Sequence, residues 1–183
     1  MDGTLLAERR LGGMSIWFSF WFGAVVAQRL AELRLAERNS ERIRSIGGYE
    51  VGASHYSRIV LLHALFLSSV FAEFLVRRPE PSPWMAAAAA AFLLLQAARF
   101  WCIRSLGPYW NTRVFVVPGM QLVRKGPYRW LKHPNYLVVT LEMLAFPLLF
   151  GCFWTACLFP AANVLLLRRR IAVEEEALRA ASA

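Results

Sequence analysis

The sequence is poor in cysteine, histidine and acidic residues. Its three cysteines are odd in number and form no CxxC pair, which argues against a disulfide framework and against a cysteine zinc site. Its three histidines are too widely scattered to indicate a metal site. Twelve Asp and Glu residues oppose 21 Lys and Arg residues, so the net charge is +9. We therefore expect no bound metal, and a partner of opposite charge.

Apolar residues are abundant. They make up 57% of the chain, against about 45–50% in a typical soluble domain. A lipid bilayer with anionic headgroups explains both the apolar excess and the positive charge, whereas nucleic acid explains only the charge. We expect the bilayer as partner, no nucleic acid, and, from the length, one domain over residues 1–183.

Five apolar segments predict an all-α integral membrane protein. The segments end at charges, prolines or glycines and cover residues 11–28, 59–76, 84–102, 134–150 and 153–167. A cleavable signal peptide is an alternative for the first segment. It would export the arginine-rich segment 29–57, against the positive-inside rule. The chain has no internal repeat, which argues against a transporter.

Lys and Arg residues outside the spans predict the orientation. Segments 29–57, 104–132 and 168–179 lie on one side of a five-span bundle and carry most of the cations. The N-terminal lead and the connection at Arg77-Arg78 carry few. The positive-inside rule then places the N-terminus outside and the C-terminus in the cytoplasm. Outside the predicted helices, Val114 to Val117 is typical of a short extended piece.

Several ionisable residues lie inside the predicted spans. His63, Arg99 and Glu142 lie toward the cytoplasmic side of their helices, and Glu73 lies near the outer end of its helix. Charged groups in lipid usually face the bundle interior or a water-filled cavity. The first three therefore predict either a substrate cavity open to the cytoplasm, or a structural role in an Arg99–Glu142 pair or in snorkelling near the interface. Glu73 is interpreted as interfacial.

The stretch GPYRWLKHPNY, residues 126–136, concentrates turn residues, aromatics and cations. Pro134 is typical of the first turn of a helix, so His133 and Tyr136 share one face of the helix start. The free N–H groups there favour an anion such as a carboxylate. Tyr128 and Trp130 are suited to enclosing a flat ring. The alternative is a basic, aromatic loop at the membrane surface.

The stretch RIAVEEEAL, residues 170–178, follows the last span. Arg170 and Glu174 are four residues apart, so both can face one cavity from a cytoplasmic helix. The alternative is an ordinary ion pair on a solvated helix face, which contributes a few tenths of a kcal/mol.

Together, the two stretches resemble the isoprenylcysteine carboxyl methyltransferase (ICMT) family of integral membrane enzymes that use S-adenosylmethionine. The family pattern is GxY…(R/K)HPxY, a helical hairpin, then R-x-x-x-E-E-x-x-L. It covers residues 113–178, with Lys132 where arginine is usual and Leu137 where many relatives have glycine.

Two upstream segments, RNSERIRSIGGYEVGASHY and WCIRSLGPYWNTRVFVVPG, resemble a bacterial branch of this family. Members of that branch are associated with type III polyketide synthases and O-methylate alkylpyrones or alkylresorcinols. The resemblance implies an inner-membrane enzyme whose active site faces the cytoplasm and whose acceptor is lipophilic with an acidic oxygen. Alternative acceptors are a prenylcysteine carboxylate or a phospholipid, and the alternative of another class is a non-enzymatic lipid-binding bundle.

The resemblance also implies roles for individual residues. Arg170 would face and orient the acceptor, and His133 would be the base for a weakly acidic acceptor. Other residues of the acceptor site would be Glu142, Arg99 and His63. The cofactor-binding residues would be Met120, Gln121, Leu122, Val123, Tyr128, His133, Pro134, Asn135, Tyr136 and Glu174.

Overall fold

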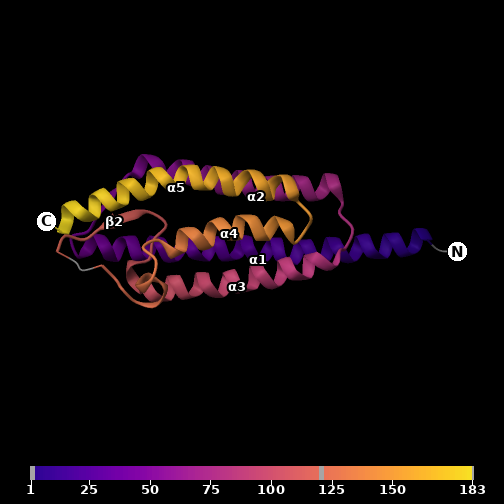
Figure 1. Cartoon of the computed structure of the whole chain (residues 1–183), viewed down its shortest axis with the longest axis horizontal. Coiled ribbons are helices and arrows are strands. Elements are labelled where there is room, and N and C mark those ends of the chain that lie inside the picture. Colours follow the sequence, from indigo (N-terminus) through magenta and orange to yellow (C-terminus); the bar gives the residue numbers. More distant parts are fainter. Residues whose placement is uncertain (1–2, 120–121, 183) are drawn as a thin grey trace.

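The chain folds into an elongated bundle of helices (Figure 1). The structure is a computed structural model that describes residues 3–119 and 122–182, without the side chains of residues 3–13, 54, 55 and 182. Its helices are α1 (Gly3–Ser45), α2 (Ala53–Arg77), α3 (Pro83–Leu106), α4 (Pro134–Leu148) and α5 (Phe153–Ser182), with short 3-10 turns η1 (Gly107–Tyr109) and η2 (Gly126–Arg129).

The helices alternate in direction along the bundle. The α2–α3 and α4–α5 connections lie at one end, and η1, η2 and the C-terminus lie at the other (Figure 1). Each of the five predicted spans falls within or largely overlaps one of these helices. Helix α1 continues unbroken past its predicted span and ends at Ser45. It ends there because Gly47, two residues later, adopts a φ of +85°, which is outside the helical range. Helix α5 likewise runs from its apolar half into its charged half without a break.

An aromatic core holds the helices together. Phe18 of α1 stacks on Phe74 of α2 with ring centroids 3.8 Å apart. Phe150, which is fully buried after α4, packs edge-on against both rings. Phe146 of α4 contacts Phe92 of α3 at a centroid distance of 5.3 Å. Burial of such rings supplies much of the packing energy of the bundle.

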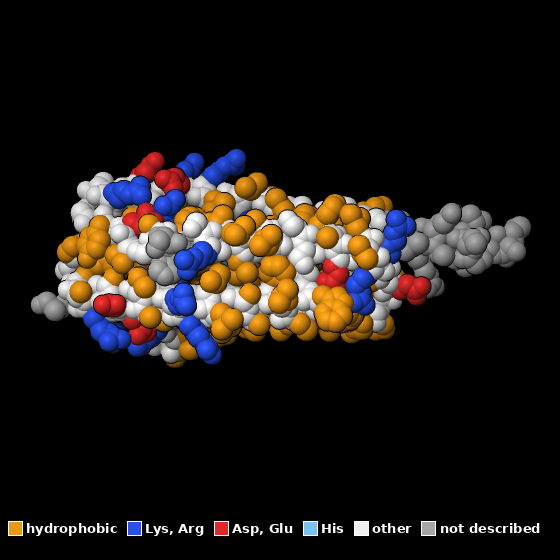
Figure 2. Space-filling view, turned by 90° about the horizontal axis from the view of Figure 1, so that it is seen from above, with side chains coloured by type: hydrophobic (Ala, Val, Ile, Leu, Met, Phe, Trp, Pro, Cys, Tyr) orange, Lys and Arg blue, Asp and Glu red, His pale blue; other side chains and the backbone are white. Residues whose placement is uncertain are grey.

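Apolar side chains also cover the outside of the bundle. Figure 2 shows hydrophobic side chains along the middle of its length and charged side chains gathered toward its two ends. Two helical segments of the described residues, Tyr56–Arg77 and Pro83–Tyr109, are long and apolar enough to cross a membrane. Helix α4 has only 15 residues, about 22 Å at 1.5 Å per residue, against a hydrocarbon core of about 30 Å. The five-span count and the orientation stay predictions.

A two-stranded sheet interrupts the all-α pattern. Strand β1 (Tyr49–Val51) pairs antiparallel with β2 (Val114–Val116), and Glu50 lies opposite Phe115. The expected extended piece at 114–117 is confirmed by β2. Strand β1 was not expected from the sequence. The sheet joins the end of α1 to the long connection between α3 and α4.

Glu73 of α2 caps the first turn of α5. Its carboxylate accepts hydrogen bonds from the backbone N–H groups of Trp154 at 3.1 Å and Thr155 at 2.8 Å, and from the Thr155 hydroxyl at 2.7 Å. A helix start leaves backbone N–H groups without partners and favours negative charge. Glu73 therefore has a specific structural partner at the end of the bundle that holds the α2–α3 and α4–α5 connections.

This cap predicts that substitutions of two acidic residues on neighbouring segments change the stability of the protein to different extents. Substituting Glu73→Ala should lower the free energy of unfolding by about 1–2 kcal/mol, because α5 loses its N-terminal cap. Glu80→Ala, at an exposed position in the α2–α3 connection, is the control and should have little effect. Thermal unfolding of both purified variants in the same detergent measures the difference. Equal melting temperatures would contradict the capping role.

Candidate active site

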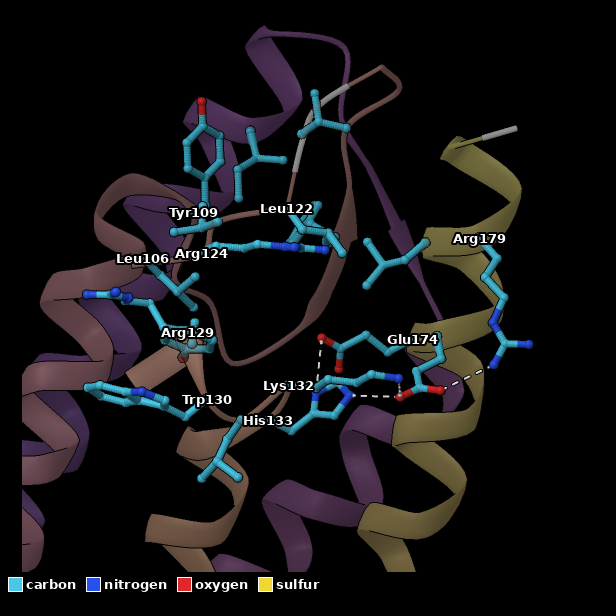
Figure 3. Close-up of a pocket in the computed structure, with 18 residues that line it drawn as sticks. Leu106, Tyr109, Leu122, Arg124, Arg129, Trp130, Lys132, His133, Glu174 and Arg179 are labelled. Atoms are coloured by element: carbon cyan, nitrogen blue, oxygen red, sulfur yellow. Dashed lines mark hydrogen bonds and ion pairs between the residues drawn. The ribbon is translucent and has the colours of Figure 1, made fainter. Parts of the chain in front are cut away.

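A cavity of about 730 Å³ lies at the end of the bundle that holds the sheet. Figure 3 shows its wall, formed by residues of the α3–α4 connection, the start of α4 and the charged end of α5. Leu106, Leu122 and Trp130 give it an apolar side. Both predicted motif stretches therefore contribute to one cavity, although they are separated by the α4–α5 hairpin.

Local backbone constraints position the first motif. Gly126 has a φ of +54°, and a Cβ there would lie 2.1 Å from the Ser105 hydroxyl oxygen, so only glycine fits beside α3. Pro127 then occupies the second position of η2. Pro134 occupies the first position of α4, as predicted, and His133 is the N-cap residue.

The two motifs meet in a hydrogen-bonded chain. The Tyr136 hydroxyl donates to Glu174 Oε2 at 2.5 Å, and Arg170 Nε donates to the Tyr136 hydroxyl at 2.8 Å. The His133 ring stacks on the Tyr136 ring with centroids 5.3 Å apart and planes 10° apart. The prediction that His133 and Tyr136 share a face is confirmed by the stacked rings. Arg170 and Glu174 both contact the Tyr136 hydroxyl, but only Glu174 lines a cavity, so the prediction that both face one cavity stays a prediction.

Ionisable side chains at the cavity lie close to one another. His133 Nδ1 lies 3.9 Å from Glu174 Oε1, and its Nε2 lies 3.5 Å from Glu175 Oε1 (Figure 3). The ammonium of Lys132 and a hydrogen bond from Arg179 hold the pKa of the Glu175 carboxyl below its ordinary value. Burial raises the pKa of the Tyr128 hydroxyl, so Tyr128 is protonated at neutral pH. The wall therefore keeps the Glu175 carboxylate ionised beside the neutral Tyr128 hydroxyl.

A second cavity of about 100 Å³ shares part of its lining with the first, including Tyr128, His133 and Glu174. Asn135 and Tyr136 line the second cavity. Asn135 Oδ1 is buried and has no hydrogen-bond partner among the described residues. Buried polar atoms are normally paired, so this atom is suited to binding a polar group of a ligand.

The predicted cofactor residues are largely gathered at the two cavities. Leu122, Val123, Tyr128, His133 and Glu174 line the larger one. Asn135 and Tyr136 line the smaller one, and Pro134 is buried behind them. Met120 and Gln121 lie outside the described residues. Arg170 lines neither cavity but contacts both Tyr136 and the carbonyl oxygen of Thr112, at 2.6 Å.

Two of the predicted acceptor residues in the spans, Arg99 and Glu142, belong to a separate cluster. Arg99 donates to Glu142 at 3.1 Å and makes two hydrogen bonds to Glu32, at 2.6 and 2.5 Å. Arg29 bridges the same two carboxylates at 3.0 and 2.7 Å. The structural Arg99–Glu142 pair, one of the two alternatives, is thus present. His63 Nδ1 contacts the carbonyl oxygen of Ile59 at 2.8 Å. A substrate role for His63, Arg99 and Glu142 stays a prediction.

Two members of this buried cluster were missed from the sequence. Arg29 and Glu32 lie just beyond the first apolar segment, in the arginine-rich segment 29–57 that was expected to lie outside the spans. Their spacing of three residues on one helix face was the available signal. What the sequence does not show is that α3 and α4 bring a second arginine and a second glutamate to the same face.

An elongated helical bundle with an apolar surface, and with a cavity of charged and apolar residues at one end, fits an all-α membrane protein. The chain belongs to the isoprenylcysteine carboxyl methyltransferase (ICMT) family, which it matches over residues 87–180. Membership implies a membrane methyltransferase, and members of the family generally use S-adenosylmethionine.

Two relatives extend the likeness beyond the matched region. The chain is 46% identical to "Uncharacterized protein YpbQ" of Bacillus subtilis (strain 168) over 162 residues, which cover 87% of this chain and 96% of that protein. It is 21% identical to an "Uncharacterized protein" of Haemophilus influenzae over 164 residues, covering 89% of this chain and 95% of the other. No solved structure matches the chain.

The buried cluster of Arg29, Glu32, Arg99 and Glu142 predicts a strong effect of removing one charge. Arg99→Leu should lower the free energy of unfolding by about 3–5 kcal/mol, because two carboxylates then share a single arginine. Arg104→Leu, at an exposed position of the same helix, is the control. The double variant Arg99→Leu/Glu142→Leu restores charge balance and should be more stable than Arg99→Leu alone. Thermal unfolding in detergent gives the order, and a double variant less stable than the single one would contradict it.

Proposed function

We propose that this protein is a membrane O-methyltransferase that transfers the methyl group of S-adenosylmethionine to a lipophilic acceptor with an acidic oxygen. The observation that carries the proposal is the convergence of the two motifs on one cavity. Tyr136, Arg170 and Glu174 come from two different helices and form one hydrogen-bonded chain beside it. A non-enzymatic bundle has no need of such a chain.

The residues at the cavities fit the cofactor. S-adenosylmethionine supplies an electrophilic methyl group on a sulfonium centre when bound. Glu174 is placed to hold an ammonium group, and Asn135 Oδ1 is a buried acceptor without a partner among the described residues. His133 and the start of α4 are suited to a carboxylate. The larger cavity, at about 730 Å³, is within the usual range for small-molecule sites.

Arg170 is the residue that we assign to orienting the acceptor oxygen. A guanidinium carries five N–H donors, so Arg170 can hold Tyr136 and Thr112 and still donate to an anionic oxygen. A pyrone hydroxyl or a carboxylate is already largely ionised near neutral pH and needs no base. A less acidic resorcinol hydroxyl needs one, and His133 is the candidate. Transfer from a cation to an anion reduces charge, which a partly dehydrated cavity favours.

The apolar side of the cavity supports a lipophilic acceptor. Leu122, Trp130 and Leu131 line it and expose 58%, 69% and 48% of their surface, so a hydrocarbon tail has apolar contacts from the cavity outward. The acceptor that we favour is an alkylpyrone or alkylresorcinol, on the resemblance of residues 38–56 and 101–119 to the polyketide-associated branch. A bacterial cell membrane and a cytoplasmic active site complete the proposal, supported by the distribution of Lys and Arg.

Binding and turnover should separate in two variants. The purified protein should bind S-adenosylhomocysteine in calorimetry, and Glu174→Gln should weaken that binding about tenfold or more because a buried charged contact is lost. Arg170→Ala should retain the binding and lose methyl transfer. The transfer is measured by mass spectrometry of lipid extracts as the replacement of one hydrogen by methyl.

Arg168→Ala is the matched control, since Arg168 is exposed on the same helix two residues earlier. It should leave both binding and transfer unchanged. Absence of any binding by the unmodified protein would favour a non-enzymatic lipid-binding bundle. A methylated prenylcysteine or phospholipid in the extracts would keep the reaction and replace the acceptor.

A further inference from the structure

The carbonyl oxygen of Thr112 is a fixed contact of Arg170. Arg170 Nη2 donates to it at 2.6 Å, while Arg170 Nε donates to Tyr136. These two hydrogen bonds, from neighbouring nitrogens of the planar guanidinium, define where it lies. The position of Arg170 therefore depends on how firmly the backbone at Thr112 is held.

Asn111 encloses Thr112 in a tight turn. The Asn111 Oδ1 atom accepts a hydrogen bond from the backbone N–H of Arg113 at 2.9 Å. An asparagine that binds the backbone two residues onward forms an Asx turn, which constrains the peptide groups between them. The Thr112 carbonyl is one of these groups, so its direction toward Arg170 follows from the turn.

Helix α1 anchors the same asparagine. Asn111 Nδ2 donates to the Ser40 hydroxyl at 2.8 Å and to the Ala36 carbonyl oxygen at 3.0 Å. Asn39, one position along α1, donates to the carbonyl oxygen of Trp110 at 2.7 Å. Ala36, Asn39 and Ser40 are all buried. Buried polar atoms destabilise the fold unless they are hydrogen-bonded. These hydrogen bonds therefore hold Asn111 in one position relative to α1.

Strand β1 holds the other side of the turn. Arg113 Nη1 lies 3.2 Å from both carboxylate oxygens of Glu50, and its guanidinium lies 4.5 Å from the centre of the Tyr56 ring. The turn thus joins the two upstream segments, residues 38–56 and 101–119. The first of these segments lies wholly before residue 87, where the family match begins.

We propose that Asn111, anchored by α1 through Ser40 and Ala36, is a positioning residue that sets Arg170 for methyl transfer. This role rests on the proposed function. Asn111 acts through the Thr112 carbonyl, and the N-terminal third of the chain thereby contributes to the active site. Displacing a group that orients the reacting oxygen by about 1 Å is enough to cost on the order of 100-fold in rate.

The test compares two substitutions of one residue. Asn111→Ala removes both the turn and the anchor, and should lower kcat about tenfold or more. Its Kd for S-adenosylhomocysteine should stay within about threefold, because Glu174 and His133 are not altered. Asn111→Ser can still accept from the Arg113 N–H, although more weakly, and should recover part of the lost kcat. The acceptor KM, kcat, Kd and melting temperature are measured for each variant.

Ser69→Ala is the matched control. It removes a half-buried hydroxyl that is hydrogen-bonded to Thr155 at 2.8 Å, at the opposite end of α5 from Arg170. It should lower the melting temperature without lowering kcat. An unchanged kcat in Asn111→Ala would overturn the positioning role, and so would a loss of cofactor-product binding in step with kcat. Failure of the unmodified protein to bind S-adenosylhomocysteine or to methylate would instead overturn the proposed function.

Discussion

Charge that is buried between apolar helices has to be neutralised inside the bundle. Arg29 and Glu32 of α1 lie against Arg99 of α3 and Glu142 of α4. Each of the two arginines donates hydrogen bonds to both glutamates. Each ion alone would carry a desolvation penalty of several kcal/mol. The three helices can therefore pack only in the arrangement that brings the four groups together. The cavity lies just beyond this cluster, and the ends of the same helices form its surroundings.

The candidate active site is built from both rigid helices and an irregular connection of the chain. Helices α4 and α5 provide Tyr136, Arg170 and Glu174, whose separation is fixed by the packing of the hairpin. The connection between α3 and α4 provides the walls, and α1 and β1 hold that connection from behind. Polar groups that lie on rigid helices are held in place more precisely than groups on loops, and the supported connection leaves the cavity open beside them.

The sequence predicted the parts of this structure that are encoded locally. Pro134 marks the start of α4 because proline suits a first helical turn, and the five apolar segments correspond to helices because each is long and ends at charges or turn residues. The convergence of residues 126–136 and 170–178 was also predicted, through the resemblance to a family pattern.

The remaining features depend on contacts between distant segments. Strand β1 has three residues, too few to show an alternating pattern, and exists because β2 pairs with it. The sequence does not indicate that Glu73 caps α5, because the capped residues Trp154 and Thr155 lie 81 and 82 positions after Glu73 in the chain. Asn111 and Ser40 are unremarkable in their own neighbourhoods. A single polar residue acquires its role only when the tertiary fold supplies its partner.

Helix α5 also fixes the direction in which each of its side chains points. It runs unbroken from Phe153 to Ser182. Thr155 is hydrogen-bonded to Glu73 at its start, Asn163 to Thr140 in its middle, and Arg170 to Tyr136 near its end. One added residue between Asn163 and Arg170 would turn everything beyond it by about 100° and advance it by about 1.5 Å. Both motifs would then be intact as sequences, yet Arg170 and Glu174 would face away from Tyr136. The length of the segment between the motifs is therefore as much a part of the active site as the residues themselves.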